Sequence, residues 1–183
     1  MIPAIRSSTS PGIFLGDSLH LFPCESGDGS RTVPLNQSPS RDVLFKFDGL
    51  RAYKRQTSLK AAHFLQYLRK KFPYKIRAIQ IDGGSEFKDQ FEEECQKRKI
   101  LLFLNPPRSP KPNGHVERAN RTLREEFYEV EEVSLSLEEH NKQLEEWEYV
   151  YNCIRPHQAL DYLTPYEYYR QWKRKHRPNV SLM

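Results

Sequence analysis

The chain has 183 residues and a net charge of +5, from 29 lysines and arginines against 24 aspartates and glutamates. This length can hold one domain with an appreciable hydrophobic core. A hydrophobic fraction of 37% and a charged fraction of 29% are typical of a soluble globular protein. No apolar run approaches transmembrane length, so we expect no membrane partner. Three widely spaced cysteines without a CxxC pair favour reduced thiols in a cytoplasmic protein: Cys24, Cys95 and Cys153.

The first 40 residues differ in composition from the rest of the chain. Serine, proline and glycine account for 17 of them, which favours loop or disorder. The run from Gly27 to Ser40 shows no alternation of apolar and polar side chains, and its prolines argue against a central strand. We therefore expect residues 1–40 to be a poorly ordered or degraded segment that contains the first strand.

Alternating helices and strands are predicted in the middle of the chain. Thr57 or Ser58 can cap a first helix, and Pro73 stops it. The hydrophobic pattern then predicts, in order, a buried strand over 75–81, a helix over 88–97 and a second buried strand over 100–104. Such alternation indicates an α/β layer structure.

Two acidic residues stand at notable positions in this region. Asp82 follows a strand and precedes two glycines, a chain reversal that leaves its carboxylate at the strand's carboxyl end. The segment 105–114 is too proline-rich to be helix or central strand, and its last two residues, Asn-Gly, predict the turn before the next helix. That helix, over 115–128, carries Glu117. Two acids from distant elements can meet at one metal-binding point.

Two further helices are predicted near the C-terminus. Ser136 and Glu139 have capping-box spacing, and so do Thr164 and Glu167, with Pro165 at the first helical position. The Arg155-Pro156-His157 segment is predicted to lock these helices against the core. Aromatic residues at helical spacing favour core packing over base stacking: Tyr166, Tyr168, Tyr169 and Trp172.

Four segments in order resemble the catalytic core of insertion-sequence transposases and retroviral integrases. They are IQIDGGSEF at 79–87, PRSPKPNGHVERANRTL at 107–123, YNCIRPHQAL at 151–160 and LTPYEYY at 163–169. The likeness extends over roughly residues 53–172. It implies an α/β, ribonuclease H-like fold, with a central mixed sheet flanked by helices. It also implies a catalytic core at 41–130 and a C-terminal helical extension at 131–183.

The resemblance further implies an Asp-Asp-Glu triad that holds metal ions. Asp82 matches the second acid and Glu117 the third, 35 positions later. Asp17 is our choice for the first acid, 65 positions before Asp82 and in an opening that resembles the family's. Other aspartates fit less well: Asp28, Asp42 and Asp48. Taken alone, Asp82 is a turn former and Glu117 a surface ion-pair partner of Arg121, four residues on.

The implied activity is metal-dependent cleavage and strand transfer of double-stranded DNA by a transposase. The three carboxylates would bind Mg²⁺ or Mn²⁺, with two ions serving the attacking and leaving oxygens. Relatives act as multimers, so a homo-oligomer is expected. Two alternatives stay open. One is an inactive, truncated or frameshifted remnant that only binds nucleic acid. The other is an unrelated interaction module.

The distribution of charge agrees with a nucleic-acid partner. Five residues around Glu117 are candidates for DNA contact, with helix solvation as the alternative: Arg108, Lys111, Asn120, Arg121 and Arg124. Residues 125–148 carry ten acids against the single Lys142. A second basic cluster follows in the tail, where DNA contact and a merely solvated surface are both open: Arg170, Lys173, Arg174, Lys175 and Arg177.

Overall fold

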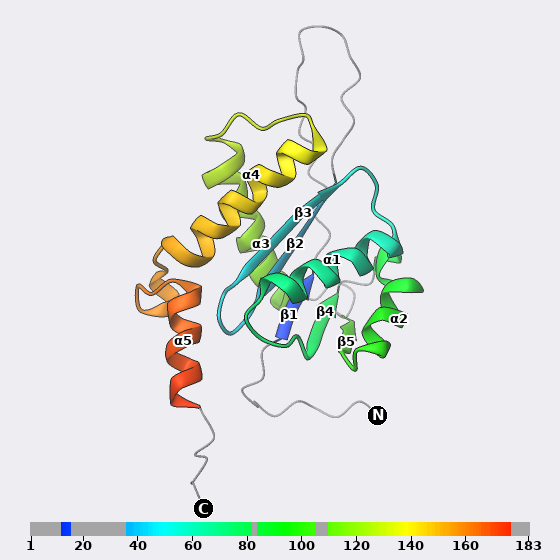
Figure 1. Cartoon of the computed structure of the whole chain (residues 1–183), viewed down its shortest axis with the longest axis horizontal. Helices are drawn as coiled ribbons and strands as arrows, with labels where there is room; N and C mark the ends of the chain where they lie inside the picture. The colour runs from blue at the N-terminus through cyan, green and yellow to red at the C-terminus, as the bar shows by residue number, and fades with distance from the viewer. Residues whose placement is uncertain (1–11, 16–35, 82–83, 105–109, 177–183) are drawn as a thin grey trace, which may run out of the picture.

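The computed structural model describes residues 12–15, 36–81, 84–104 and 110–176. Its centre is a five-stranded sheet with the order β3-β2-β1-β4-β5, flanked by helices (Figure 1). The two antiparallel pairs are β1–β2 and β2–β3, and the two parallel pairs are β1–β4 and β4–β5. The strands are β1 Gly12–Leu15, β2 Asn36–Asp42, β3 Asp48–Tyr53, β4 Ala78–Ile81 and β5 Leu101–Leu104.

Strand β2 corrects our expectation for the N-terminal segment. It includes Pro39 and lies between β1 and β3, so part of the run that we expected to avoid a central strand forms one. Among the described residues, the pairing of β1 with β2 ends at Leu15↔Ser40, one position short of Pro39. On the other side Pro39 is opposite Leu50, whose N–H is bonded to Glu148 instead of to β2. The missing N–H of Pro39 therefore costs the sheet no hydrogen bond to β3.

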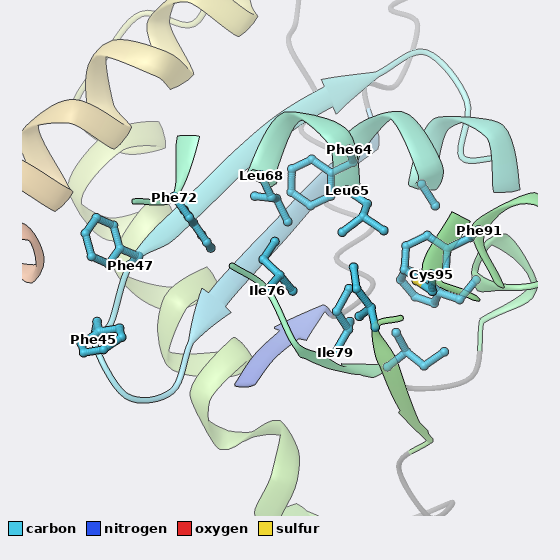
Figure 2. Close-up of a cluster of buried hydrophobic side chains, with 14 of the residues drawn as sticks. Phe45, Phe47, Phe64, Leu65, Leu68, Phe72, Ile76, Ile79, Phe91 and Cys95 are labelled. Carbon is cyan, nitrogen blue, oxygen red and sulfur yellow. The ribbon is translucent and has the colours of Figure 1, made fainter. Parts of the chain in front are cut away.

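Helices α1 (Ser58–Lys71) and α2 (Gln90–Lys97) are close to the positions that the sequence predicts. The hydroxyl of Thr57 caps α1 by accepting from the Lys60 N–H at 3.3 Å. Side chains from α1, α2 and the loops around β4 form one hydrophobic cluster (Figure 2). Its most deeply buried members are Phe45, Leu65, Leu68, Ile79, Phe91 and Cys95.

Strand β5 is less buried than the sequence pattern predicts. The expected strand is present, but it forms the edge of the sheet, and Leu101 and Leu104 are 62% and 69% exposed. A continuous apolar run is therefore ambiguous, because it does not reveal which faces a neighbour covers.

Helix α3 (Pro110–Leu123) begins earlier than expected and continues as the π-helical turn η2 (Arg124–Tyr128). The prediction of a non-helical segment through Gly114, with a turn at its end, is wrong. Pro110 and Pro112 lie in the first turn, where backbone N–H groups have no partner within the helix, so both prolines are tolerated. The helix packs across β2 and β1.

The C-terminal part contains α4 (Leu137–Tyr149), the turns η3 (Val150–Ile154) and η4 (Gln158–Leu160), and α5 (Pro165–Lys175). The capping box of Thr164 and Glu167 is confirmed. The one predicted at Ser136 is wrong, because its side chain makes no cap bond, and Glu139 accepts from Ser134 Oγ at 2.5 Å instead.

A second hydrophobic cluster lies between β3 and the later helices. It consists of Leu50, Ala52, Leu123, Phe127 and Leu144. Gly49 precedes Leu50 in β3, and its Cβ position lies on the other face of the sheet, against Leu68 of α1. Because successive strand residues point to opposite faces, helices cover both faces of the sheet. No helix in the described ranges is long and apolar enough to cross a membrane.

Candidate active site

The two strands that lead into the predicted aspartates are neighbours in the sheet. β1 and β4 run parallel, with Ile13 opposite Ile79 and Phe14 opposite Gln80. The carboxyl ends of parallel strands meet at one edge of a sheet. Asp82 follows directly after β4 and Asp17 comes two residues after β1, and both lie outside the described residues.

Glu117 lies on α3, the helix that packs across β2 and β1. One face of this helix is buried through Ala119 and Leu123, while the side chain of Glu117 is exposed to solvent. A glutamate on a packed helix has a fixed backbone and a long, free side chain. The structure thus describes one member of the predicted triad and the strands that precede the other two.

The arginines near Glu117 have carboxylate partners of their own. Arg121 Nε donates to Glu125 Oε1 at 2.7 Å, four residues further along, so the alternative pairing of Arg121 with Glu117 is wrong. Arg124 Nε lies 3.5 Å from Glu129 Oε1. Both arginines are exposed, and such pairs are weak.

The remaining predicted DNA contacts are described less fully. Arg108 lies outside the described residues, and for Lys111 the structure describes the helical backbone of α3. Asn120 is half-buried on the same helix. In the sequence, these positions follow the end of β5 and continue into α3.

Glu86 is a residue of this region that sequence reasoning passed over. It lies in the 3₁₀ turn η1 (Ser85–Phe87), four residues after Asp82. One of its carboxylate oxygens is buried without a hydrogen-bond partner among the described residues. Its place inside the IQIDGGSEF segment was the available signal, because an acid so close to a strand end can face the same edge.

A network of charged and aromatic side chains fixes η2, the continuation of α3. The Arg41 guanidinium and the Asp48 carboxylate form a buried ion pair, and Arg41 also lies over the ring of Tyr151, 5.0 Å from its centroid. Arg155 lies against the same ring at 5.5 Å and binds Glu126 in η2. The helix that carries Glu117 is therefore anchored at its end to β2, β3 and η3.

His157 supports this network in its neutral form. Burial lowers the pKa of His157 below its ordinary value of 6.5. The ring Nε2 is 3.0 Å from the backbone oxygen of Tyr151, and Nδ1 is 3.1 Å from Arg155 Nη1. A neutral ring satisfies both contacts when Nε2–H donates and Nδ1 accepts. The Arg155-Pro156-His157 segment, predicted to lock the last helices against the core, contacts η2 through Arg155 and Glu126, while His157 bonds within the C-terminal part.

The donor set suits a hard divalent cation. Carboxylate oxygens from two aspartates and one glutamate are ligands that Mg²⁺ and Mn²⁺ accept. Within the described part of the chain, no group of three or more histidines, cysteines, aspartates or glutamates is placed to hold a metal. The fit therefore depends on the chemistry of the residues and on the two strand ends that converge at one edge.

Comparisons with known proteins identify relatives of this chain. Residues 98–165 match the model of the integrase core domain. A protein of Spiroplasma virus SpV1-C74 named "Putative integrase ORF3" is 30% identical over 106 residues, which cover 51% of this chain and 29% of the viral protein. The chain thus spans less than a third of the length of this curated relative.

Two solved structures share the fold. The catalytic core domain of BIV integrase superposes with a TM-score of 0.63 at 18% identity, covering 90% of this chain and 98% of that one. A simian T-cell lymphotropic virus intasome, solved in complex with PP2A regulatory subunit B56 gamma, superposes with a TM-score of 0.68 at 18% identity. The match covers 98% of this chain and 60% of that one. The expected ribonuclease H-like fold is confirmed.

Proposed function

We propose that the chain carries an integrase-type catalytic core and performs metal-dependent cleavage and strand transfer of DNA as a transposase. Asp17, Asp82 and Glu117 are the proposed catalytic residues and metal ligands. The observation that supports this assignment best is the parallel pairing of β1 with β4, because it brings the carboxyl ends of the two strands that precede the aspartates to one edge of the sheet.

Each carboxylate has a distinct task in this proposal. Asp82 follows directly after β4, and the sheet pairs β4 on both sides, so the residue that precedes Asp82 has a fixed backbone. Glu117 has a longer side chain on an anchored helix, which allows its carboxylate to adjust when DNA enters. When bound, divalent ions would lower the pKa of the attacking hydroxyl and stabilise the leaving oxygen.

Double-stranded DNA is the proposed substrate. Its phosphates would contact four basic residues and one amide that precede or follow Glu117: Arg108, Lys111, Arg121 and Arg124, with Asn120. Two of these, Arg121 and Arg124, would exchange carboxylate partners for phosphates, a small cost because exposed ion pairs contribute little stability. We also assign residues 131–183 as a helical extension of the core and expect a homo-oligomer on DNA.

Metal-dependent nicking of an end-labelled duplex tests this function. The wild-type chain should cleave with Mg²⁺ or Mn²⁺ and lose cleavage with EDTA. Replacing a catalytic metal ligand typically costs several orders of magnitude in rate, so Asp82→Asn and Glu117→Gln should both abolish cleavage. Glu131→Gln removes one exposed charge from the turn after η2 and should leave the rate unchanged.

The assay also separates the enzyme from an inactive remnant. Binding of the duplex without cleavage under any metal condition would reduce the function to nucleic-acid binding. Cleavage that survives both Asp82→Asn and Glu117→Gln would mean that the catalytic groups lie elsewhere or that a contaminant is responsible. The presence of β1, β2 and β3 in one sheet supports an intact core over a degraded one.

A further inference from the structure

Helix α5 has a buried aromatic face and an exposed basic face. Its aromatic side packs on the core through the half-buried Tyr168 and Trp172 and the buried Tyr169. Tyr166, in contrast, is 42% exposed, so the predicted core packing holds for three of the four aromatic residues. The basic face consists of three exposed side chains from successive turns: Arg170, Lys173 and Arg174. Lys175 is also exposed, but it follows Trp172 by three residues and lies toward the aromatic side.

The aromatic face fixes α5 at one end of the sheet. Phe45, in the turn between β2 and β3, contacts the rings of Tyr169 and Trp172 with centroids 5.2 and 5.3 Å apart. Tyr169 Oη donates to the backbone oxygen of Pro73, just before β4, at 2.8 Å. Figure 1 shows α5 beside the β2–β3 turn, away from α2 and β5.

This end of the sheet is opposite the candidate active site. Asp42, the last residue of β2, pairs with Ile13 near the start of β1, and Pro73 precedes β4. The candidate active site is expected where β1 and β4 end. The four residues of β4 span roughly 13 Å, so the two regions lie at opposite ends of that strand.

Among the described residues, no carboxylate forms an ion pair with the cations of α5. Glu167 is the only acid in the helix, and its carboxylate accepts from the N–H and hydroxyl of Thr164 at 2.9 and 3.0 Å. The ion pairs between described residues use arginines and lysines of other elements. Arg121 and Arg124 of the α3–η2 helix, by comparison, are already paired with glutamates. The basic face of α5 is therefore available to an external anion.

We propose that this face binds the phosphate backbone of duplex DNA, as a contact remote from the catalytic edge. The inference rests on the proposed function, in which DNA is the substrate. Cations on successive turns repeat about every 5.4 Å along a helix and can each replace a counterion on the backbone. Contacts of this kind carry no sequence information but orient the duplex.

An acidic surface on a second copy is the competing partner, and the observations favour DNA over it. Residues 125–148 are acidic, but many of their carboxylates are already engaged within the chain. Glu125, Glu126 and Glu145 form ion pairs, and Glu148 is buried. A polyanion with one charge per phosphate lacks such internal neutralisation.

The test compares two variants that each lose three positive charges. Arg170→Gln/Lys173→Gln/Arg174→Gln removes the basic face, and Lys97→Gln/Lys99→Gln/Lys142→Gln removes exposed lysines elsewhere. The affinity for a labelled 30-base-pair duplex is measured over a series of NaCl concentrations. The α5 variant should bind about tenfold more weakly at about 0.1 M salt. Its association constant should also depend less on salt, with the slope of log association constant against log salt concentration smaller in magnitude by about two to three. The control variant should remain within about twofold of wild type, since non-contacting charges act only through screened potentials.

Further measurements make each outcome decisive. Circular dichroism must show the same unfolding temperature for all chains, and Arg170→Lys/Arg174→Lys should retain wild-type affinity. Wild-type affinity and slope in the α5 variant would overturn the proposal. So would unchanged DNA binding combined with loss of salt-sensitive self-association in light scattering. Failure of the proposed function is seen separately, as absence of metal-dependent cleavage by the wild-type chain.

Discussion

Asn152 pairs with both backbone groups of Asp48, a residue 104 positions earlier. Its Oδ1 accepts from the Asp48 N–H at 2.9 Å, and its Nδ2 donates to the Asp48 carbonyl at 2.8 Å. Asn141 does the same with Ala52, at 2.9 and 3.1 Å. Side chains of α4 and η3 thus bind the outer edge of β3 as a neighbouring strand would, and they close an edge that would otherwise be unpaired.

Removing the amide of Asn152 should therefore destabilise the fold. In Asn152→Ala, the N–H and carbonyl of Asp48 stay buried and lose their partners, which should lower the free energy of unfolding by about 2–4 kcal/mol. Urea denaturation measures the loss. Lys142→Ala, on the solvent side of α4, should change stability by less than about 0.5 kcal/mol. Equal stability of the two variants would contradict a sealing role for Asn152.

Glu148 also binds the outer edge of β3, through a buried carboxylate that contacts one backbone N–H. It accepts from the Leu50 N–H, and Tyr67 Oη donates to its other oxygen at 2.6 Å. Burial raises the pKa of Glu148 from 4.5 to about 7, against the opposing effect of these hydrogen bonds. The folded chain therefore binds this proton more tightly than the unfolded chain does.

The sign of the resulting pH dependence follows from that difference. The contribution of Glu148 to stability is fully present below pH 4.5 and is lost as pH rises toward about 7. This loss lowers the free energy of unfolding by on the order of 3 kcal/mol. Glu148→Gln keeps an acceptor for the Leu50 N–H and removes the buried charge. Its unfolding free energy, measured from pH 4.5 to 8, should fall less steeply than that of wild type.

Part of the pH dependence should survive in the variant. Burial also raises the pKa of Asp42 to about 7, although its carboxylate accepts from the Phe45 N–H. Asp42 therefore destabilises the fold over the same pH interval. Parallel curves for wild type and Glu148→Gln would show that Glu148 titrates as it does in the unfolded chain.

Local patterns in the sequence predicted those elements whose determinants are local. Helix α1 has its cap, apolar face and terminating proline within about 16 residues, and the observed bounds differ little from the predicted ones. Strand β2 was missed because its residues show no apolar alternation, and because the register that makes its proline acceptable cannot be read from the local pattern. Pro39 is acceptable there because it is opposite Leu50, whose N–H points away from β2 toward Glu148, so this register needs no N–H from Pro39 on that side.

The candidate site shows the same division. The spacing of Asp82 and Glu117, and the strand and helix that position them, could be predicted from motifs. The polar residues that seal β3 could not, since Asn141 and Glu148 lie in an acidic run whose composition is that of a solvated surface. Only the strand that they contact distinguishes them from their exposed neighbours.

Gly49 is a position where any side chain should be costly. A Cβ atom there would lie 2.2 Å from Leu68 Cδ2 and 2.9 Å from Ser40 Oγ. Gly49→Ala should lower the free energy of unfolding by about 1–3 kcal/mol through overpacking. In a chain that already carries Leu68→Ala, the substitution Gly49→Ala should cost less than it does in the wild-type chain, because the nearer clash is gone. Additive losses in the double-mutant cycle would argue against the close contact.

The pairing of Arg121 with Glu125 predicts that a carboxylate limits DNA affinity. Glu125→Gln removes the partner that holds Arg121 Nε at 2.7 Å, and it should tighten duplex binding about threefold at low salt. Glu132→Gln removes an equal charge from an exposed position without releasing an arginine. The two variants differ in affinity only if Arg121 contacts the phosphate backbone.

Metal binding should stabilise the chain through the proposed triad, independently of catalysis. A cation that binds only the folded state raises the unfolding free energy by about 1.4 kcal/mol at ten times its dissociation constant. Thermal unfolding with increasing Mn²⁺ should therefore show a rising midpoint for wild type. The rise should be strongly reduced in Asp17→Asn, Asp82→Asn and Glu117→Gln and retained in Glu131→Gln. A rise in Asp17→Asn equal to that of wild type would remove Asp17 from the triad and leave the other two acids to be tested with a different first ligand.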